Sequence, residues 1–259
     1  MFEKELKISL IACKEAMKNI MKYYNSGFHV EIKSDESPVT EADKTSDKLI
    51  RDILTKEFPS YSFLTEESDD DLSRLNNDLV FIIDPLDGTK DFVHKDDEFT
   101  VNIALSYKHK VVLGVVGVPA KNIIYYAVEG LGAFKIDENG KISQIHVSDK
   151  TSNLTCLTSV YHSTKAEEEV REKYKDKITS VVKKGSSLKA CLIAEGKAEI
   201  SYRLSEGTKE WDTAAFQIIV EEAGGLVLKV DKTPMTYNRK DVYNREWYLI
   251  INRIENFLI

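Results

Sequence analysis

The feature that most constrains the fold is an uninterrupted apolar run that leads directly into acidic residues. The run is Leu79-Val-Phe-Ile-Ile83, and Asp84-Pro-Leu-Asp-Gly-Thr-Lys-Asp-Phe92 follows it. A strand with one solvated face would alternate apolar and polar residues, so a continuous run predicts a strand that is buried on both faces. The fold must bury this strand, and folds of the α/β class place their chemistry at strand ends.

The first 150 residues predict two helices beside a largely antiparallel sheet. Apolar residues recur every three or four positions over 6–24 and 49–54, and we expect Gly27 and Pro59 to end these helices. Thr40 stands three residues before Asp43, as in a capping box. Alternating apolar and polar residues predict a β-hairpin formed by 99–107 and 111–118. Further short strands are expected over 28–33, 61–64, 123–128, 133–136 and 142–147.

The remainder of the chain, residues 151–259, changes to an alternation of strands and helices, which indicates an α/β segment. The expected strands are 154–160, 178–182, 199–203 and 247–251, and the expected helices are 166–174, 186–194 and 212–223. The chain has no repeat and no flexible linker. We therefore expect residues 1–150 and residues 151–259 to pack tightly against each other, with a cleft between them.

The charge of the chain is concentrated in one window. The 43 acidic and 36 basic residues give a net charge of −7, and residues 66–98 alone hold twelve acids and three bases. An acidic chain is not expected to bind nucleic acid polymers, whose partners are basic. Small phosphorylated ligands remain possible, because metal ions can bind them to acidic residues.

The cysteines and the hydropathy indicate the cellular compartment that we expect for the protein. Cys13, Cys156 and Cys191 are odd in number and lie in apolar contexts, so we expect buried free thiols and a reducing compartment, the cytoplasm. No run reaches the ~18 apolar residues of a membrane span, and we expect none.

The acidic segment after the buried strand has the composition of a cation site. Pro85 fixes one φ angle and Gly88 permits a tight turn, so Asp84 and Asp87 can converge with the Leu86 carbonyl between them. Such oxygen ligands suit a hard cation such as Mg²⁺, and Glu66-Glu67 upstream could complete the set. The alternative is a plain turn, because Asp-Pro and Asp-Gly are common turn dipeptides.

With these residues in view, the chain resembles the inositol monophosphatase superfamily of Mg²⁺-dependent, lithium-sensitive phosphatases. Among its branches it is most similar to the 3′(2′),5′-bisphosphate nucleotidases of the bacterial CysQ type. Five blocks carry the resemblance in order: Ser37-Pro-Val-Thr-Glu-Ala-Asp43, Thr65-Glu-Glu67, Asp84-Pro-Leu-Asp-Gly-Thr89, Gly185-Ser-Ser-Leu-Lys189 and Trp211-Asp-Thr-Ala-Ala215. The resemblance implies a five-layer αβαβα sandwich, the sugar phosphatase fold, of mixed α+β and α/β character.

The resemblance also implies a metal centre and a mechanism. Two or three Mg²⁺ ions would be bound by Glu66, Asp84, the Leu86 carbonyl, Asp87 and Asp212, and Li⁺ would inhibit the enzyme. The implied catalytic residues are Asp43, Thr89 and Glu66. Asp43 would orient the Thr89 hydroxyl, which holds a metal-activated water for in-line attack on a phosphate.

The implied substrate is adenosine 3′,5′-bisphosphate, hydrolysed to AMP and phosphate. Inositol phosphatases commonly carry Glu where this chain has Arg203, and a guanidinium suits a second phosphate. The implied substrate-binding residues are Glu66, Leu86, Asp87, Gly88, Thr89, Lys90, His162, Ser186, Lys189, Arg203 and Asp212. The expected partner is thus a small phosphorylated nucleotide, bound by a monomer or homodimer.

Other interpretations stay open at this point. The chain could instead be an inositol monophosphatase or another sugar-phosphate phosphatase of the same fold, or a non-catalytic nucleotide-binding protein. Asp43 and Asp212 could act only as helix caps, and Lys189 and Arg203 could be surface charges. We expect the nine remaining acids of the 66–98 window, including Asp69-Asp-Asp71, to be mostly solvated loop charge.

Overall fold

The computed structural model describes residues 2–32 and 38–259. Lys33, the expected end of a strand, and Ser37, the first residue of the first block, lie outside the described residues. The helices are α1 (Glu3–Ser26), α2 (Glu41–Glu57), η1 (Ser73–Asn76), α3 (Thr89–His94), η2 (Pro119–Lys121), α4 (Lys165–Lys173), α5 (Leu188–Ala194), α6 (Glu210–Glu222) and η3 (Ile254–Asn256). The strands are β1 (Val30–Ile32), β2 (Pro38–Thr40), β3 (Ser62–Thr65), β4 (Leu79–Asp87), β5 (Thr100–Tyr107), β6 (Lys110–Val118), β7 (Ile123–Val128), β8 (Gly132–Ile136), β9 (Ile142–Ile145), β10 (Leu154–Thr158), β11 (Ile178–Lys183), β12 (Ile200–Arg203), β13 (Leu226–Lys229) and β14 (Tyr248–Ile251).

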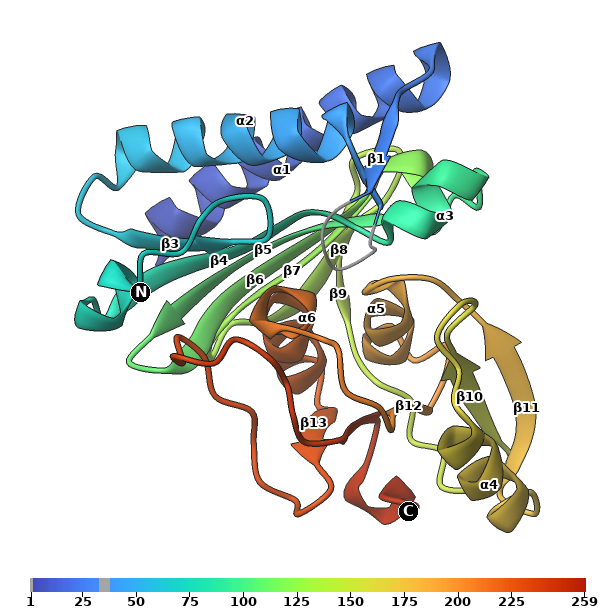
Figure 1. Cartoon of the computed structure of the whole chain (residues 1–259). Helices are drawn as coiled ribbons and strands as arrows, with labels where there is room; N and C mark the ends of the chain where they lie inside the picture. The colour runs from blue at the N-terminus through green and yellow to red at the C-terminus, as the bar shows by residue number, and fades with distance from the viewer. Residues whose placement is uncertain (1, 33–37) are drawn as a thin grey trace.

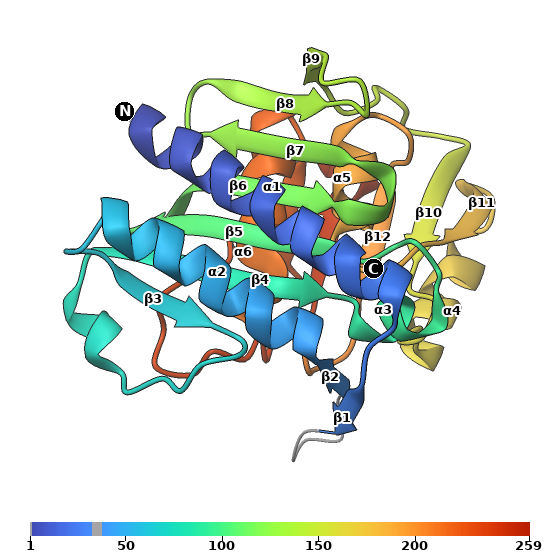
Figure 2. The ribbon, with the colours of Figure 1, turned by 90° about the horizontal axis from the view of Figure 1, so that it is seen from above.

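These elements form five alternating layers (Figure 1). Helices α1 and α2 cover one face of a seven-stranded sheet of order β3-β4-β5-β6-β7-β8-β9, as Figure 2 shows from above. Helices α5 and α6 lie between its other face and a five-stranded sheet of order β11-β10-β12-β14-β13. Helix α4 covers that sheet from outside, where Ala166 and Val170 pack against its core. The expected αβαβα sandwich is confirmed.

Strand β4 is buried as its composition predicts, but it is longer than expected. Leu79 is half-buried, and the rest of the strand from residue 80 to residue 86 is buried. It pairs in parallel with β3 and antiparallel with β5. The prediction that the strand ends before Asp84 is wrong, because it continues to Asp87 with an irregular register between Asp84 and Asp87. Such an irregularity redirects side chains at the end of a strand.

Other boundaries differ in ways that concern the site. The sequence did not predict α3, β2 or β13. Helix α5 begins at Leu188 instead of residue 186, and α6 begins at Glu210 instead of Asp212. Asp212 is therefore not the N-cap of α6. It lies in the first turn, where its carboxylate accepts a hydrogen bond from the Lys209 backbone N–H.

Helix α6 packs against both sheets and so joins the two halves of the chain. One hydrophobic cluster contains Ile82 from β4, Ala215 from α6 and Ile250 from β14. A Cβ at Gly114 of β6 would lie 2.2 Å from the Ala215 carbonyl oxygen, so glycine permits the close approach of α6 to the sheet. The division into residues 1–150 and 151–259 stays a prediction.

The expected thiols are confirmed, since Cys13, Cys156 and Cys191 are buried and free. Among the described residues, no helix is both long enough and apolar enough to cross a membrane.

Candidate active site

A cavity of about 540 Å³ opens where the end of β4 faces α5, β12 and the start of α6. Residues from far-separated segments line it, which explains why no single stretch of sequence defines the site. The lining contains every residue expected to bind substrate: Glu66, Leu86, Asp87, Gly88, Thr89, Lys90, His162, Ser186, Lys189, Arg203 and Asp212.

One end of this cavity is acidic, and we call it the acidic end. Asp84 and Asp87 from β4 and Asp212 from α6 each present an oxygen within 4.8 Å of the others. Glu66 follows β3, where its backbone N–H donates to the Ile83 carbonyl at 3.2 Å, and it lines the same cavity outside this trio. The register irregularity of β4 lets two aspartates three residues apart converge.

Neighbouring donors hold the Asp87 carboxylate in place. Its Oδ2 atom accepts hydrogen bonds from the Ser187 backbone N–H and hydroxyl at 2.7 Å each, and from Thr100 Oγ1 at 3.1 Å. Asn102 Nδ2 lies 3.3 Å from the same oxygen. Since one oxygen takes all four contacts, the carboxylate is oriented while its second oxygen stays available to a cation.

The electrostatics of the acidic end fit a divalent cation. Burial raises the pKa of Asp84 well above its usual value, and the charges of Glu66, Asp87 and Asp212 add to the shift. The pKa of Asp212 is raised by burial first and then by Asp87 and Glu66. A bound divalent cation would reverse these shifts and stabilise the ionised carboxylates, whose hard oxygens are the ligands Mg²⁺ prefers.

Asp43 and Thr89 meet beside the acidic end. The Thr89 hydroxyl donates to Asp43 Oδ1 at 3.2 Å, while Thr40 donates to Oδ2 from its backbone at 2.8 Å and its hydroxyl at 2.6 Å. Asp43 is 2% exposed, and burial raises its pKa to about 6. It lies behind the cavity wall, so the capping box of α2 and the Thr89 contact use the two oxygens of one carboxylate.

The basic residues of the cavity lining form a second group, whose charges act together on His162, and we call this group the basic end. It contains Lys90 from α3, His162, Lys189 from α5 and Arg203 from β12. Lys189 Nζ donates to the Ser186 carbonyl at 2.8 Å, and burial lowers its pKa. The pKa of His162 is lowered by partial desolvation and then by the charges of Arg203, Lys90 and Lys189. Arg203 Nε is buried, with no hydrogen-bond partner among the described residues.

Gly88 connects the two ends at the start of α3. Its φ of 87° lies in the left-handed region, and a Cβ there would come within 3.1 Å of Asp91 Oδ2 and 3.2 Å of the Ser186 Cβ. Glycine is therefore required for the turn that places Thr89 and Lys90.

The sequence reasoning missed several lining residues. Ser187, one residue after the expected Ser186, anchors Asp87, whereas the Ser186 hydroxyl donates to the Glu98 carbonyl. Lys209 and Tyr248 also line the cavity. Ser187 lies within the block Gly185-Ser-Ser-Leu-Lys189, so the sequence contained a signal for it. No motif marks Lys209 or Tyr248.

The expectation that the remaining acids of the 66–98 window are solvated is wrong for some of these acids. Glu98 is paired with Lys184 and accepts the Gly185 N–H at 2.8 Å. Asp70 pairs with the buried Arg74 at 2.7 Å. These acids build the scaffold around the cavity instead of a solvated loop.

Comparison with known sequences finds one matching family model and relatives that share one name. The model of the "Inositol monophosphatase family" matches residues 2–254. The "3'(2'),5'-bisphosphate nucleotidase CysQ" of Haemophilus influenzae is 32% identical over 249 residues, which cover 93% of this chain and 90% of that protein. The protein with the same name from Escherichia coli K12 is 36% identical over 227 residues, covering 86% of this chain and 90% of that one.

Solved structures share the architecture. CysQ from Bacteroides thetaiotaomicron superposes with a TM-score of 0.85 at 33% identity and covers 97% of this chain and 98% of that one. An inositol monophosphatase from Thermotoga maritima gives a TM-score of 0.80 at 28% identity, covering 96% and 92%. The two neighbours carry different names on one fold, so the choice of substrate must come from the cavity.

Proposed function

Because the chain belongs to the inositol monophosphatase family, whose members are phosphatases, we propose that it is a Mg²⁺-dependent, lithium-sensitive 3′(2′),5′-bisphosphate nucleotidase. The proposed reaction converts adenosine 3′,5′-bisphosphate to AMP and phosphate in the cleft between residues 1–150 and residues 151–259. The relatives named as bisphosphate nucleotidases support the proposal. The free, buried cysteines support a location in the cytoplasm, where thiols stay reduced.

The acidic end is the proposed metal centre. Asp84, Asp87, Asp212, Glu66 and the Leu86 carbonyl would hold the ions, in keeping with the converging oxygens and the raised pKa of Asp84. When bound there, Mg²⁺ would lower the pKa of a water and neutralise charge on the phosphate and the leaving oxygen.

Asp43 and Thr89 are the proposed positioning pair for the nucleophile. The Thr89 hydroxyl is a hydrogen-bond donor to Asp43 Oδ1 at 3.2 Å and also lies 3.3 Å from the Leu86 carbonyl oxygen, so its own oxygen can act as an acceptor for water. The second Asp43 oxygen is fixed by Thr40, which prevents the carboxylate from rotating. These residues orient the water for in-line attack on the 3′-phosphate.

The observation that carries the substrate assignment is the place of Arg203 in the cavity wall, where its charge acts on His162 together with the charges of Lys90 and Lys189. A guanidinium binds phosphate through two parallel hydrogen bonds. Lys90, His162 and Lys189 line the same end, so a second phosphate held there would leave the first at the acidic end. An inositol monophosphate has no second phosphate to use these cations.

The second candidate is an inositol monophosphatase, which the shared fold of the Thermotoga maritima protein favours. Phosphate release from adenosine 3′,5′-bisphosphate and from myo-inositol 1-phosphate, each with Mg²⁺, decides between the two. We expect a kcat/KM at least about 100-fold higher for the bisphosphate, loss of activity with a chelator, and inhibition by Li⁺. A preference for the inositol ester would overturn the nucleotidase assignment and leave the phosphatase assignment standing.

A further inference from the structure

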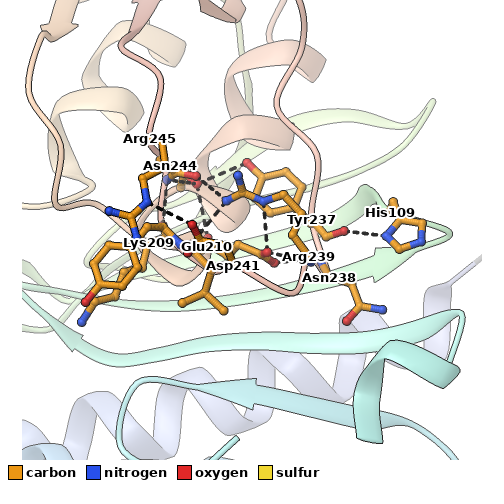
Figure 3. Close-up of polar contacts among 12 residues, drawn as sticks. His109, Lys209, Glu210, Tyr237, Asn238, Arg239, Asp241, Asn244 and Arg245 are labelled. Carbon is orange, nitrogen blue, oxygen red and sulfur yellow. Dashed lines mark hydrogen bonds and ion pairs between the residues drawn. The ribbon is translucent and has the colours of Figure 1, made fainter. Parts of the chain in front are cut away.

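A buried polar network outside the cavity joins two segments that lead to the proposed metal centre. Residues 237–244, which we call the strap, belong to the connection between β13 and β14. Figure 3 shows Asn238, Arg239 and Asn244 of the strap gathered around Glu210, the first residue of α6. The network therefore touches α6 two residues before Asp212.

On the α6 side, Glu210 is fully buried and both of its oxygens are used. Its Oε2 accepts the Asn238 backbone N–H at 2.6 Å, and its Oε1 accepts the Arg239 backbone N–H at 2.8 Å and the Arg239 Nε at 3.2 Å. Asn244 Nδ2 donates to the Lys209 carbonyl at 3.0 Å. These contacts fix the first turn of α6 to the strap.

On the opposite side, Arg74 fixes the strap to the loop that begins at Glu66. Arg74 is 1% exposed, and its guanidinium contacts Asp70 through Nε at 3.1 Å and Nη2 at 2.7 Å. Its Nη1 donates to Asn238 Oδ1 at 2.8 Å, and Asn238 Nδ2 returns a bond to the Arg74 carbonyl at 3.2 Å. Asn238 thus contacts both charged residues, Arg74 with its side chain and Glu210 with its backbone.

We infer that Glu210, Asn238 and Arg74 are positioning residues that set where Asp212 lies relative to Glu66, and thereby the cation affinity of the acidic end. The inference rests on the proposed function of that end. Buried ion pairs add little net stability compared with apolar packing of the same volume, so stability alone does not account for this network. Fully satisfied polar networks do fix a unique geometry. Groups that hydrogen-bond directly to metal ligands typically change metal affinity 10- to 100-fold when removed, and this network acts one step further out, through the backbone before Asp212 and after Glu66.

Two variants cut the network at different points. Glu210→Gln turns an amide donor toward backbone N–H groups and breaks the α6 side. Asn238→Gly keeps the φ of 56°, which glycine adopts freely, and keeps the N–H to Glu210 while removing the amide that reaches Arg74. The matched control is Lys135→Met, which breaks the half-buried ion pair between Lys135 of β8 and Glu195 at the end of α5.

The measurement is the dissociation constant of Mn²⁺ from the protein without substrate, read from the electron paramagnetic resonance signal of free Mn²⁺. We expect Glu210→Gln to raise this constant about tenfold, the lower end of the effect of a direct partner, Asn238→Gly to raise it less, and the control to leave it unchanged. Circular dichroism melts confirm that each variant is folded. If Glu210→Gln does not fold, Asn238→Gly alone decides.

Wild-type Mn²⁺ affinity in the folded variants, with or without a lower melting temperature, would overturn the inference. Asp87→Asn in the same assay separates this failure from that of the proposed function. If Asp87→Asn loses Mn²⁺ while both network variants retain it, only the positioning role is wrong. If Asp87→Asn also binds Mn²⁺ as the wild type does, the proposed metal centre is wrong.

Discussion

The two ends of the cavity are built differently. At the acidic end, Asp87 takes four donor contacts on one oxygen and Asp43 is held by Thr40 and Thr89, so neighbouring protein groups fix the geometry of both carboxylates. At the basic end, Lys90 is exposed, and the buried Nε of Arg203 has no hydrogen-bond partner in the part of the chain that the structure describes. In the proposed function, the acidic end carries the chemical step, whereas the basic end binds the second phosphate of the substrate. Reaction and selectivity should therefore respond to separate substitutions.

The largest effect is expected at the acidic end, from Asp87→Asn. Removing one negative ligand should weaken cation binding and lower kcat/KM at least about 1000-fold, because several kcal/mol of transition-state stabilisation depend on the ion. Steady-state phosphate release at saturating Mg²⁺ measures it. The control is Asp71→Asn, an exposed acid of the same window that hydrogen-bonds to Ser73 of its own loop. Full activity of Asp87→Asn would refute the role of this end.

A smaller loss of activity is expected when the attacking water is no longer oriented but the metal-binding carboxylates are unchanged. Thr89→Ala removes the hydroxyl that donates to Asp43, and kcat should fall about 100-fold with little change in KM. Thr89→Ser keeps the hydroxyl and should retain most of the activity. Equal losses in both variants would show that Thr89 acts through packing.

At the basic end, Arg203→Glu should change binding and leave the chemical step largely intact. We expect KM for adenosine 3′,5′-bisphosphate to rise about 10- to 100-fold, the equivalent of one charged hydrogen-bond pair, while the Mg²⁺ requirement stays the same. Lys183→Glu makes the same charge change on an exposed strand outside the cavity and should have little effect. A fall in kcat at unchanged KM would contradict the separation of the two ends.

The smallest effect concerns pH and His162. Its pKa is lowered from the usual 6.5 by desolvation and by Arg203, Lys90 and Lys189, while Asp87 opposes the shift. The unfolded chain therefore binds this proton more readily, so the free energy of unfolding should fall as pH drops below 6.5. Urea melts at about pH 7.5 and about pH 5.5 should show a smaller fall in His162→Gln than in the wild type. An identical fall in the free energy of unfolding would show that the charges of Arg203, Lys90 and Lys189 do not lower the pKa of His162.

The sequence predicted the acidic end more completely than the basic end, for a physical reason. Asp84 and Asp87 lie in one short segment, and the composition of that segment already favours a cation. The register irregularity that brings them together depends on the pairing of β4 with β5, which the residue pattern of one strand does not encode. The buried strand and the capping box of Thr40 were predictable, because each depends on local sequence.

The basic end depends on tertiary contacts. Its cations come from α3, a loop, α5 and β12, so only the fold shows that they meet. Lys209 and Tyr248 escaped prediction for this reason. Arg74 and Asp70 also escaped, since a basic residue in an acidic window looks solvated until its burial is known.

The most direct test of the two-ended cavity is diffraction from crystals of the slow Thr89→Ala variant soaked with Mn²⁺ and adenosine 3′,5′-bisphosphate. We predict anomalous density for Mn²⁺ among Asp84, Asp87 and Asp212, with the 3′-phosphate against it and the 5′-phosphate beside Arg203 and Lys189. Manganese density away from these aspartates, or a 5′-phosphate that does not contact Arg203, would contradict the account.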